Sequence, residues 1–204
     1  MTARQLRPED IPNAVALQRA CFPAPFPEDL LWNADHLAKH LEVFPEGQFI
    51  AEEDGRIVGS ASSCIISEEN WDAHRPWAET VGGPFVENHD PAGTTLYGID
   101  IGVHPAARRK GVGRALYQAR FNLVREKRLI RYGTACRLPG YIQWGQMQEN
   151  PAVERYASEV VSGKAADRTL TPLLRYGLRF LSVIHDYMED KESANAAALL
   201  EWKS

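Results

Sequence analysis

The sequence is poor in cysteine, and its three cysteines follow no metal-binding pattern. Cys21, Cys64 and Cys136 are odd in number and scattered along 204 residues, so they form neither a disulfide framework nor a set of zinc ligands. No neighbouring histidine pattern marks any of them as a nucleophile. We expect three small buried hydrophobes in a protein of the reducing cytoplasm.

Long apolar runs are absent as well. No stretch is long enough to span a bilayer, and residues 1–7 lack the apolar core of a signal peptide, so we expect a cytoplasmic protein with no membrane partner. The chain carries a net charge of −4, which disfavours a nucleic-acid partner. Its 44% hydrophobic content is enough for a single globular domain over residues 1–204.

Two nucleotide-binding motifs are missing. The Gly163-Lys164 pair is followed by Ala165 instead of the hydroxyl residue that a P-loop places on magnesium. A dinucleotide fingerprint beginning at Gly111 would need glycine or alanine at position 116, which is Leu116. Neither nucleotide class is therefore favoured.

A metal site is not expected either. His36 and His40 lie one helical turn apart, but Leu37 stands where a zinc protease has glutamate, and no third ligand is evident. We interpret both histidines as surface residues.

The chain does contain a strand, a basic glycine loop and a helix in direct succession. Residues 96–103 alternate in polarity, which predicts a half-buried strand. The alternation places Tyr97, Ile99, Ile101 and Val103 on one face and Gly98, Asp100 and Gly102 on the other. After the loop, apolar residues recur at helical spacing from Val112 to Leu123, so a helix should begin near Gly111.

The loop has the composition of a phosphate site. Residues 104–131 hold nine lysines and arginines against the single acid Glu126, a basic island in an acidic chain. Free N–H groups and the positive dipole end at a helix N-terminus attract phosphate, and glycine allows close approach to the backbone. A tight basic turn without a ligand is the alternative interpretation, and part of the charge is the solvated face of the helix.

The rest of the chain predicts a mixed α/β order. We expect a strand at residues 5–6, a helix from residue 11 that ends at Pro23, Pro25 and Pro27, and a second helical stretch over 28–41. A hairpin over 48–66 and an irregular segment over 67–93 should follow, the latter covering a substrate site. Beyond the central helix we expect a strand at 129–136, helices at 151–162 and 169–176, and strands at 178–187 and 196–202. The last strand conflicts with its helix-favouring composition.

These residues resemble the acyl-coenzyme A motif of the GNAT superfamily of N-acetyltransferases. Arg108, Gly111 and Gly113 match its three fixed positions, after Val103-His104-Pro105 and before an amphipathic helix. The resemblance implies an α/β fold with a mixed, largely antiparallel sheet of six to seven strands, splayed at the acyl-CoA cleft and flanked by helices. It also implies acetyl-CoA as co-substrate. Its pyrophosphate would bind at Arg108, Arg109, Lys110, Gly111, Val112, Gly113 and Arg114, and its pantetheine beside Ile101, Gly102 and Val103.

The C-terminal third is similar to a narrower group, the acetyltransferase module fused to some bacterial carbon-nitrogen hydrolases. The similarity rests on residues 137–141, 167–178 and 185–193. This chain is too short to include such a hydrolase, and the similarity names no substrate.

Acyl transfer to an amine requires a proton acceptor, an oxyanion donor and a proton source for the thiolate. The resemblance assigns the oxyanion donor to the Val103 amide and the proton acceptor to Asp100, although an aspartate satisfied by backbone or arginine at the splay is an equal alternative. The usual tyrosine acid is replaced by Leu173. Tyr176 is our candidate for that role, with Tyr141 and Tyr187 as weaker ones.

The resemblance therefore implies an N-acyltransferase, most simply an N-acetyltransferase, working by direct attack in a ternary complex. A catalytically quiet acyl-CoA sensor or interaction module is the alternative, because Leu173 replaces the acid. The acceptor, a small-molecule or peptide amine, and a homodimer both stay open. Aromatic lining residues (Trp71, Trp77, Trp144, Phe85) and acidic ones (Glu68, Glu69, Asp72, Glu79) are candidates for acceptor recognition.

Overall fold

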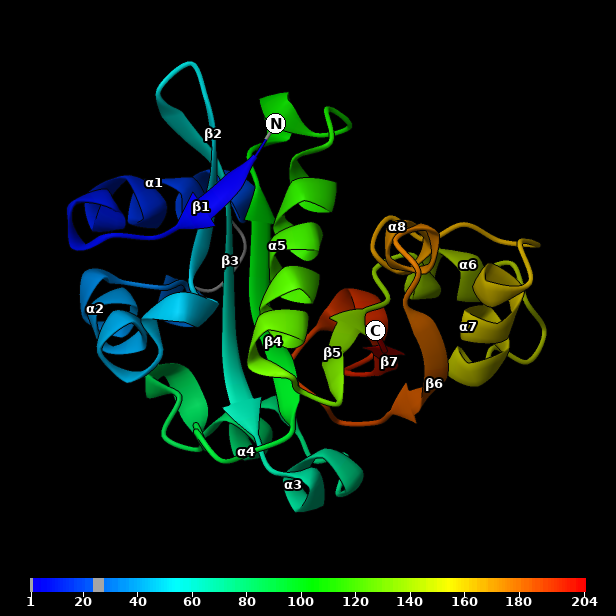
Figure 1. Ribbon diagram of the computed structural model, residues 1–204. Coiled ribbons are helices and arrows are strands. Elements are labelled where there is room, and N and C mark those ends of the chain that lie inside the picture. The colour runs from blue at the N-terminus through cyan, green and yellow to red at the C-terminus, as the bar shows by residue number, and fades with distance from the viewer. Residues whose placement is uncertain (1, 24–27) are drawn as a thin grey trace.

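The computed structural model describes residues 2–23 and 28–204 (Figure 1). The strands are β1 (Ala3–Gln5), β2 (Phe49–Glu53), β3 (Arg56–Ile66), β4 (Thr95–Val103), β5 (Arg131–Arg137), β6 (Arg179–Ile184) and β7 (Ala197–Trp202). The helices are α1 (Ile11–Cys21), α2 (Ala34–Val43), α3 (Glu68–Asp72), α4 (Trp77–Val81), α5 (Val112–Lys127), α6 (Tyr141–Gly145), α7 (Val153–Val161) and α8 (Leu170–Arg175). No helix in the described ranges is long and apolar enough to cross a membrane.

The strands form one sheet in the order β1-β2-β3-β4-β5-β7-β6. Every neighbouring pair is antiparallel except β4 and β5, which are parallel. This confirms the mixed, largely antiparallel sheet of seven strands flanked by helices. The last strand does not lie at the edge of the sheet, because β7 is inserted between β5 and β6.

Strand β7 forms against its local composition. The segment from Ala196 to Glu201 favours a helix, yet its backbone pairs with β5 on one side and β6 on the other. Ala198 and Leu200 are completely buried. Hydrogen bonding to two neighbouring strands and burial of apolar side chains therefore outweigh the small preference of these residues for a helix over a strand.

The pairing of β4 with β5 is short. It covers only Thr95–Gly98 against Arg131–Thr134, while β4 continues to Val103 paired with β3 alone. The C-terminal half of β4 therefore has an unpaired edge toward β5. This is the splay that the resemblance implied.

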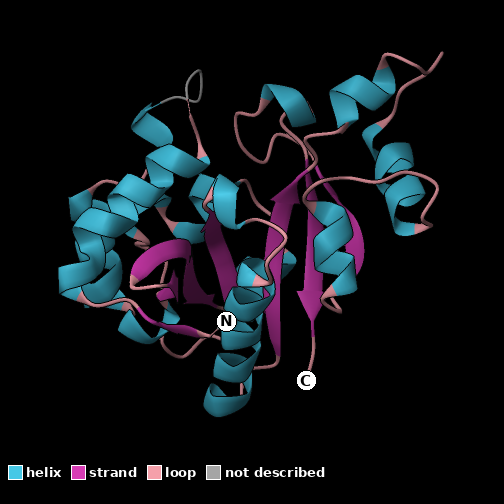
Figure 2. Ribbon diagram, turned by 90° about the horizontal axis from the view of Figure 1, so that it is seen from above, coloured by secondary structure: helices cyan, strands magenta, loops and turns pink. Residues whose placement is uncertain are grey.

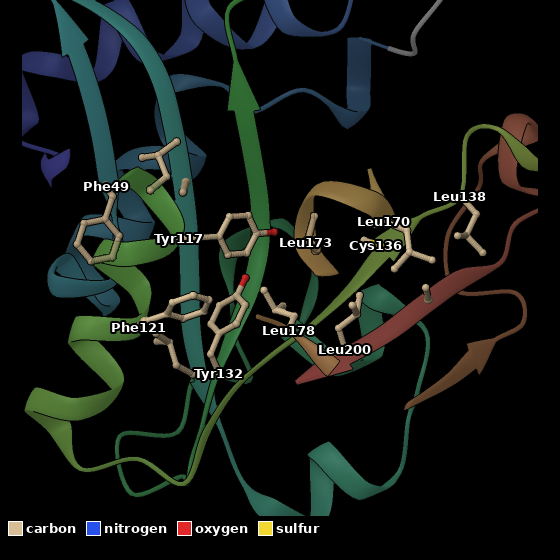
Figure 3. Packing of buried hydrophobic residues seen from close by; sticks show 14 of the residues in the cluster. Phe49, Tyr117, Phe121, Tyr132, Cys136, Leu138, Leu170, Leu173, Leu178 and Leu200 are labelled. Carbon is tan, nitrogen blue, oxygen red and sulfur yellow. The ribbon is translucent and has the colours of Figure 1, made fainter. Parts of the chain in front are cut away.

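Helices cover both faces of the sheet (Figure 2). A Cβ atom on Gly59 would touch Val112 of α5, and one on Gly102 would touch Cys21 of α1, so α5 and α1 lie on opposite faces. Figure 3 shows the core on the α5 face, where Tyr117 and Phe121 of α5 pack with Tyr132 of β5 and residues of β7 and α8. A separate cluster on the α1 face includes Trp32 and Ile50.

A β-bulge corrects the predicted faces of β4. Asp100 pairs with Ser62 and Gly98 pairs with Ser63, so Ile99 is an extra residue in the ladder. Tyr97 and Ile99 pack into the clusters on the α1–α4 side, whereas Ile101 packs against the α5 core. The prediction that all four apolar residues of 97–103 share one face is therefore wrong, because a bulge reverses the alternation.

Most other predicted elements are present with shorter bounds. The helix predicted from residue 28 begins at Ala34, after a 3-10 turn over Glu28–Leu30. The hairpin is formed by β2 and β3, and α5 begins one residue after Gly111 as predicted. Pro25 and Pro27 lie outside the described residues. The segment 67–93 contains two short helices, α3 and α4, so it is less irregular than expected.

Candidate active site

The basic glycine loop connects the unpaired end of β4 to α5. A 3-10 turn over Pro105–Ala107 is capped by His104, whose Nδ1 accepts from the Ala106 amide at 3.3 Å. Arg109 and Gly111 then adopt left-handed backbone, with φ of 63° and 89°. Two left-handed residues close together turn the chain sharply so that α5 starts directly beside the strand end.

The N-terminus of α5 has free amide donors. The first bond of the helix runs from the Ala115 amide to the Gly111 carbonyl at 3.0 Å, so the amides of Val112, Gly113 and Arg114 precede it and have no intrahelical acceptor. Gly111 provides no capping side chain, and a Cβ at this residue would meet nothing within 4 Å. The result is an open, electropositive helix end of the kind that binds phosphate.

Two of the four loop cations bind groups away from this helix end, and the other two are exposed. Arg108 Nε donates to the Val103 carbonyl at 3.2 Å, across the end of β4. Lys110 pairs with Glu53 of the β2–β3 hairpin at 3.1 Å. Arg109 and Arg114 are exposed.

The unpaired edge of β4 presents backbone groups toward β5. The His104 amide donates to the Val58 carbonyl at 2.9 Å, and amides of consecutive strand residues point in alternate directions. The amides of Ile101 and Val103 therefore point away from β3. The Val103 amide is therefore directed into the splay between β4 and β5.

Asp100 projects from the opposite side of the strand to Ile101 and contacts α1. Its Oδ2 accepts from Gln18 Nε2 at 2.7 Å. Burial raises the pKa of Asp100 above its usual range, while donors on Gln18 and Trp32 and the charge of Arg120 act in the opposite direction. A partly buried carboxylate with a raised pKa is suited to accept a proton.

Tyr176 and Asp100 approach β4 from opposite faces of the sheet. Tyr176 follows α8 and packs against Tyr117 of α5, with ring centroids 5.4 Å apart, and its Oη lies beside Gly113, because a Cβ there would be 3.4 Å from it. Burial raises the pKa of Tyr176, and Arg114 opposes this. Tyr176 therefore lies by the loop on the α5 face, whereas Asp100 reaches the α1 face. Leu173 is buried in the core.

The sequence prediction missed three residues around Asp100. Gln18 and Trp32 supply donors to its carboxylate, and Arg120 binds its backbone carbonyl. Arg120 was counted with the basic island, but it is only 1% exposed. Arg120 lies four residues after Leu116 on the apolar stripe of α5, and this position in the sequence could have indicated that it is buried.

The candidate acceptor residues do not form one surface. Trp71 packs on Gly133, Trp144 donates to Glu159, and Glu68 is paired with Arg131, which lowers the pKa of Glu68 to about 2. Trp77 and Phe85 lie instead in an aromatic group with Trp32 and His36, with centroids 4.9 to 5.9 Å apart. Since Trp32 also contacts Asp100, this aromatic group adjoins the carboxylate.

One histidine differs from its prediction. His40 is completely buried, not a surface residue, and its Nε2 lies 2.8 Å from the Pro84 carbonyl. His36 is half-buried beside Trp32.

A sheet that splays beside an uncapped helix N-terminus is the arrangement that the resemblance to the GNAT superfamily implied. Residues 11–140 match the acetyltransferase (GNAT) family, and the chain belongs to this family. It is 39% identical to "Uncharacterized N-acetyltransferase YkwB" of Bacillus subtilis (strain 168), over the whole chain and 89% of that protein. It is 34% identical to "Probable hydrolase YhcX" of the same organism, of which it spans 39%.

Solved structures share the fold along the entire chain. A GphF GNAT-like decarboxylase in complex with isobutyryl-CoA has a TM-score of 0.81 at 23% identity, covering 100% of this chain and 99% of that one. The loading GNATL domain of CurA from Lyngbya majuscula has the same TM-score at 18% identity, covering 99% and 96%. The likeness extends to the C-terminal half, beyond the residues matched by the family.

Proposed function

We propose that the protein transfers an acyl group, most simply acetyl, from acyl-coenzyme A to an amine. The observation that carries this proposal is the open N-terminus of α5 at the end of the unpaired edge of β4. Membership of the GNAT family and the 39% identity to an N-acetyltransferase support it. We propose that it is a cytoplasmic enzyme and that its acceptor is a small-molecule or peptide amine. Assembly as a homodimer is compatible with this proposal.

The residues present fit coenzyme A. A pyrophosphate fits the amides of residues 108–114, since Gly111 leaves open space and no side chain caps the helix. The edge amides of Ile101 and Val103 suit the polar pantetheine arm. An acyl-CoA bound this way would place its thioester in the splay, within reach of the Val103 amide.

The proposed chemistry needs three groups from this chain. The amine nitrogen attacks the thioester carbonyl, and the Val103 amide stabilises the oxyanion as the N–C bond forms. Asp100 takes the amine proton, directly or through water. The C–S bond then breaks, and Tyr176, whose pKa is raised by burial, donates its proton to the departing thiolate.

A second function is favoured by Leu173. This residue is part of the core, so no side chain at the family's usual acid position can reach a thiolate. A protein that binds acyl-CoA without turning it over, as a sensor or interaction module, would have this property.

Two measurements test the proposal. Calorimetric titration with acetyl-CoA should show binding at or below hundreds of micromolar, and mass spectrometry of a panel of amines should show an acetylated product with release of free thiol. Binding without any product would favour the sensor, and absence of binding would overturn both functions.

The loop can be tested with a matched pair of glycine variants. Gly111→Glu should abolish acetyl-CoA binding, because it places a bulky carboxylate where the pyrophosphate would lie. Gly163→Glu is the control, since Gly163 also has left-handed backbone, with φ of 77°, and also has open space around it. Equal loss in both variants, or no loss in Gly111→Glu, would remove the cofactor assignment.

A further inference from the structure

The direction of the Asp100 side chain depends on the β-bulge. Side chains alternate along a regular strand, so an unbulged β4 with Tyr97 on the α3 and α4 side would direct Asp100 toward α5. The extra residue Ile99 turns Asp100 to the α1 side, where Gln18 binds its carboxylate. The proposed proton acceptor is thus correctly placed only while the bulge persists.

Arg120 binds the backbone of both strands at the bulge. Its Nη2 donates to the Ser62 carbonyl at 2.7 Å and to the Asp100 carbonyl. Its Nε donates to Ser63 Oγ at 3.1 Å. One guanidinium therefore binds both strands of the ladder where their register shifts.

The surroundings of Arg120 fix its position. Its Nη1 donates to Tyr132 Oη at 3.0 Å, and its guanidinium lies 5.4 Å and 5.5 Å from the ring centroids of Tyr117 and Tyr132. Its hydrogen bonds to the described residues all go to neutral groups. A buried cation that forms no hydrogen-bonded ion pair is costly to maintain, so retaining one here calls for a role beyond packing.

We propose that Arg120 is a positioning residue of the acyl-transfer site, holding the bulge that directs the Asp100 carboxylate to the α1 face. The geometry of an arginine suits this role, because its planar fork of five donors can bind several fixed acceptors at once, whereas a lysine is a point charge. The catalytic part of the inference rests on the proposed function, but the positioning part does not.

Arg120 also influences the charge state of Asp100. The groups that face Asp100 are the donors on Gln18 and Trp32, the Ile101 amide, the Cys21 thiol of α1, and Arg120 from α5. Burial raises the pKa of Cys21 to about 12, so it stays neutral. Arg120 is thus the charged group that lowers the Asp100 pKa, and its removal should raise that pKa.

An activity-independent experiment tests the positioning. In ¹⁵N- and ¹³C-labelled protein, the Gln18 side-chain amide should shift with pH together with the Asp100 carboxyl carbon, because the two groups are 2.7 Å apart. In Arg120→Met this coupling should be lost or the Asp100 midpoint should move to higher pH. A folded Arg120→Met variant that keeps both the coupling and the wild-type midpoint would overturn the proposal.

Two further variants separate position from general stability. Arg120→Lys keeps the charge but has fewer donors, so it should keep the Asp100 midpoint near wild type and still weaken the coupling between Gln18 and Asp100. This variant also serves if Arg120→Met does not fold. A Lys variant in which Gln18 and Asp100 titrate as in wild type, at wild-type rate, would contradict a role for the fork. Arg125→Met removes an exposed arginine of the same helix and should change neither signal.

Kinetics then link the position to acyl transfer. Arg120→Met should lower kcat by about 100-fold and move the acidic limb of the pH–rate profile to higher pH. The affinity for acetyl-CoA should stay within about threefold of wild type. Arg120→Lys should recover part of the lost kcat. If acetyl-CoA affinity and kcat fall equally and the acidic limb of the pH–rate profile does not move, Arg120 has a purely structural role. If the wild type acetylates no amine, the proposed function fails, while the spectroscopic result still decides the positioning.

Discussion

Gly98 lies directly under the hydroxyl of Tyr132. A Cβ atom on Gly98 would be only 2.0 Å from Tyr132 Oη and 3.2 Å from Thr134 Oγ1. This contact occurs at the last paired position of β4 and β5, where the sheet begins to splay. The absent side chain of Gly98 is what allows Tyr132 to reach Arg120.

We expect Gly98→Ala to destabilise the fold by about 1–3 kcal/mol, because the added methyl forces Tyr132 out of its position. Urea denaturation of the single and double variants measures this. Tyr132→Phe removes the nearest clashing atom, so the added cost of Gly98→Ala should be smaller in that background. Equal costs in both backgrounds would show that Tyr132 is not the obstacle.

Replacing Asp100 should separate stability from activity. Since the folded-state pKa of Asp100 is raised by burial, its contribution to stability is full below the unfolded pKa and falls as pH rises through the folded pKa. Asp100→Asn should therefore be at least as stable as wild type at pH 7 while losing about 10²- to 10⁴-fold in turnover.

Thermal unfolding and steady-state kinetics at pH 5 and pH 7 check this expectation. Asp186→Asn, which changes an exposed aspartate elsewhere, is the control and should leave both quantities close to wild type. An Asp100→Asn enzyme with full turnover would remove Asp100 from the mechanism, and a marked loss of stability at pH 7 would assign it a structural role.

The features that the sequence predicted are those with local causes. The loop follows from Arg108, Gly111 and Gly113 at fixed spacing, and α5 follows from an apolar stripe beside them, so no distant contact is needed. The hairpin of β2 and β3 likewise follows from Asp54-Gly55 between two apolar runs.

The features that were missed depend on distant contacts. The alternation of residues 97–103 continues smoothly through Ile99, so the bulge becomes visible only in the pairing with Ser62 and Ser63. The burial of Arg120 depends on carbonyls of two other strands. Strand β7 forms because its backbone pairs with both β5 and β6, and this pairing outweighs the helical propensity of its residues.

Tyr176 can be tested for the role of proton donor. We expect Tyr176→Phe to lower kcat by about 10-fold, at the low end for a general acid because coenzyme A thiolate is a good leaving group. The dissociation constant of acetyl-CoA should change little. Single-turnover kinetics and calorimetry together measure the two quantities.

The position of Tyr176 beside Gly113 gives a distinct alternative outcome. A rise in the dissociation constant with unchanged kcat would mean that its hydroxyl contacts the cofactor instead of donating a proton. Tyr141→Phe provides the comparison, since Tyr141 at the start of α6 was a weaker candidate and packs against Trp144 and Tyr156.

His40 should make stability depend on pH between about 4 and 6.5. Burial lowers its pKa from 6.5 to about 4, so within this window the unfolded chain binds the extra proton and the folded protein does not. The stabilisation is full above pH 6.5 and is lost as pH falls, by about 3 kcal/mol in total.

Urea titrations at several pH values should show that the free energy of unfolding depends less on pH in His40→Gln than in wild type. His36→Gln, which alters a half-buried histidine of the same helix, should flatten it less; an unchanged slope in His40→Gln would contradict a neutral buried His40.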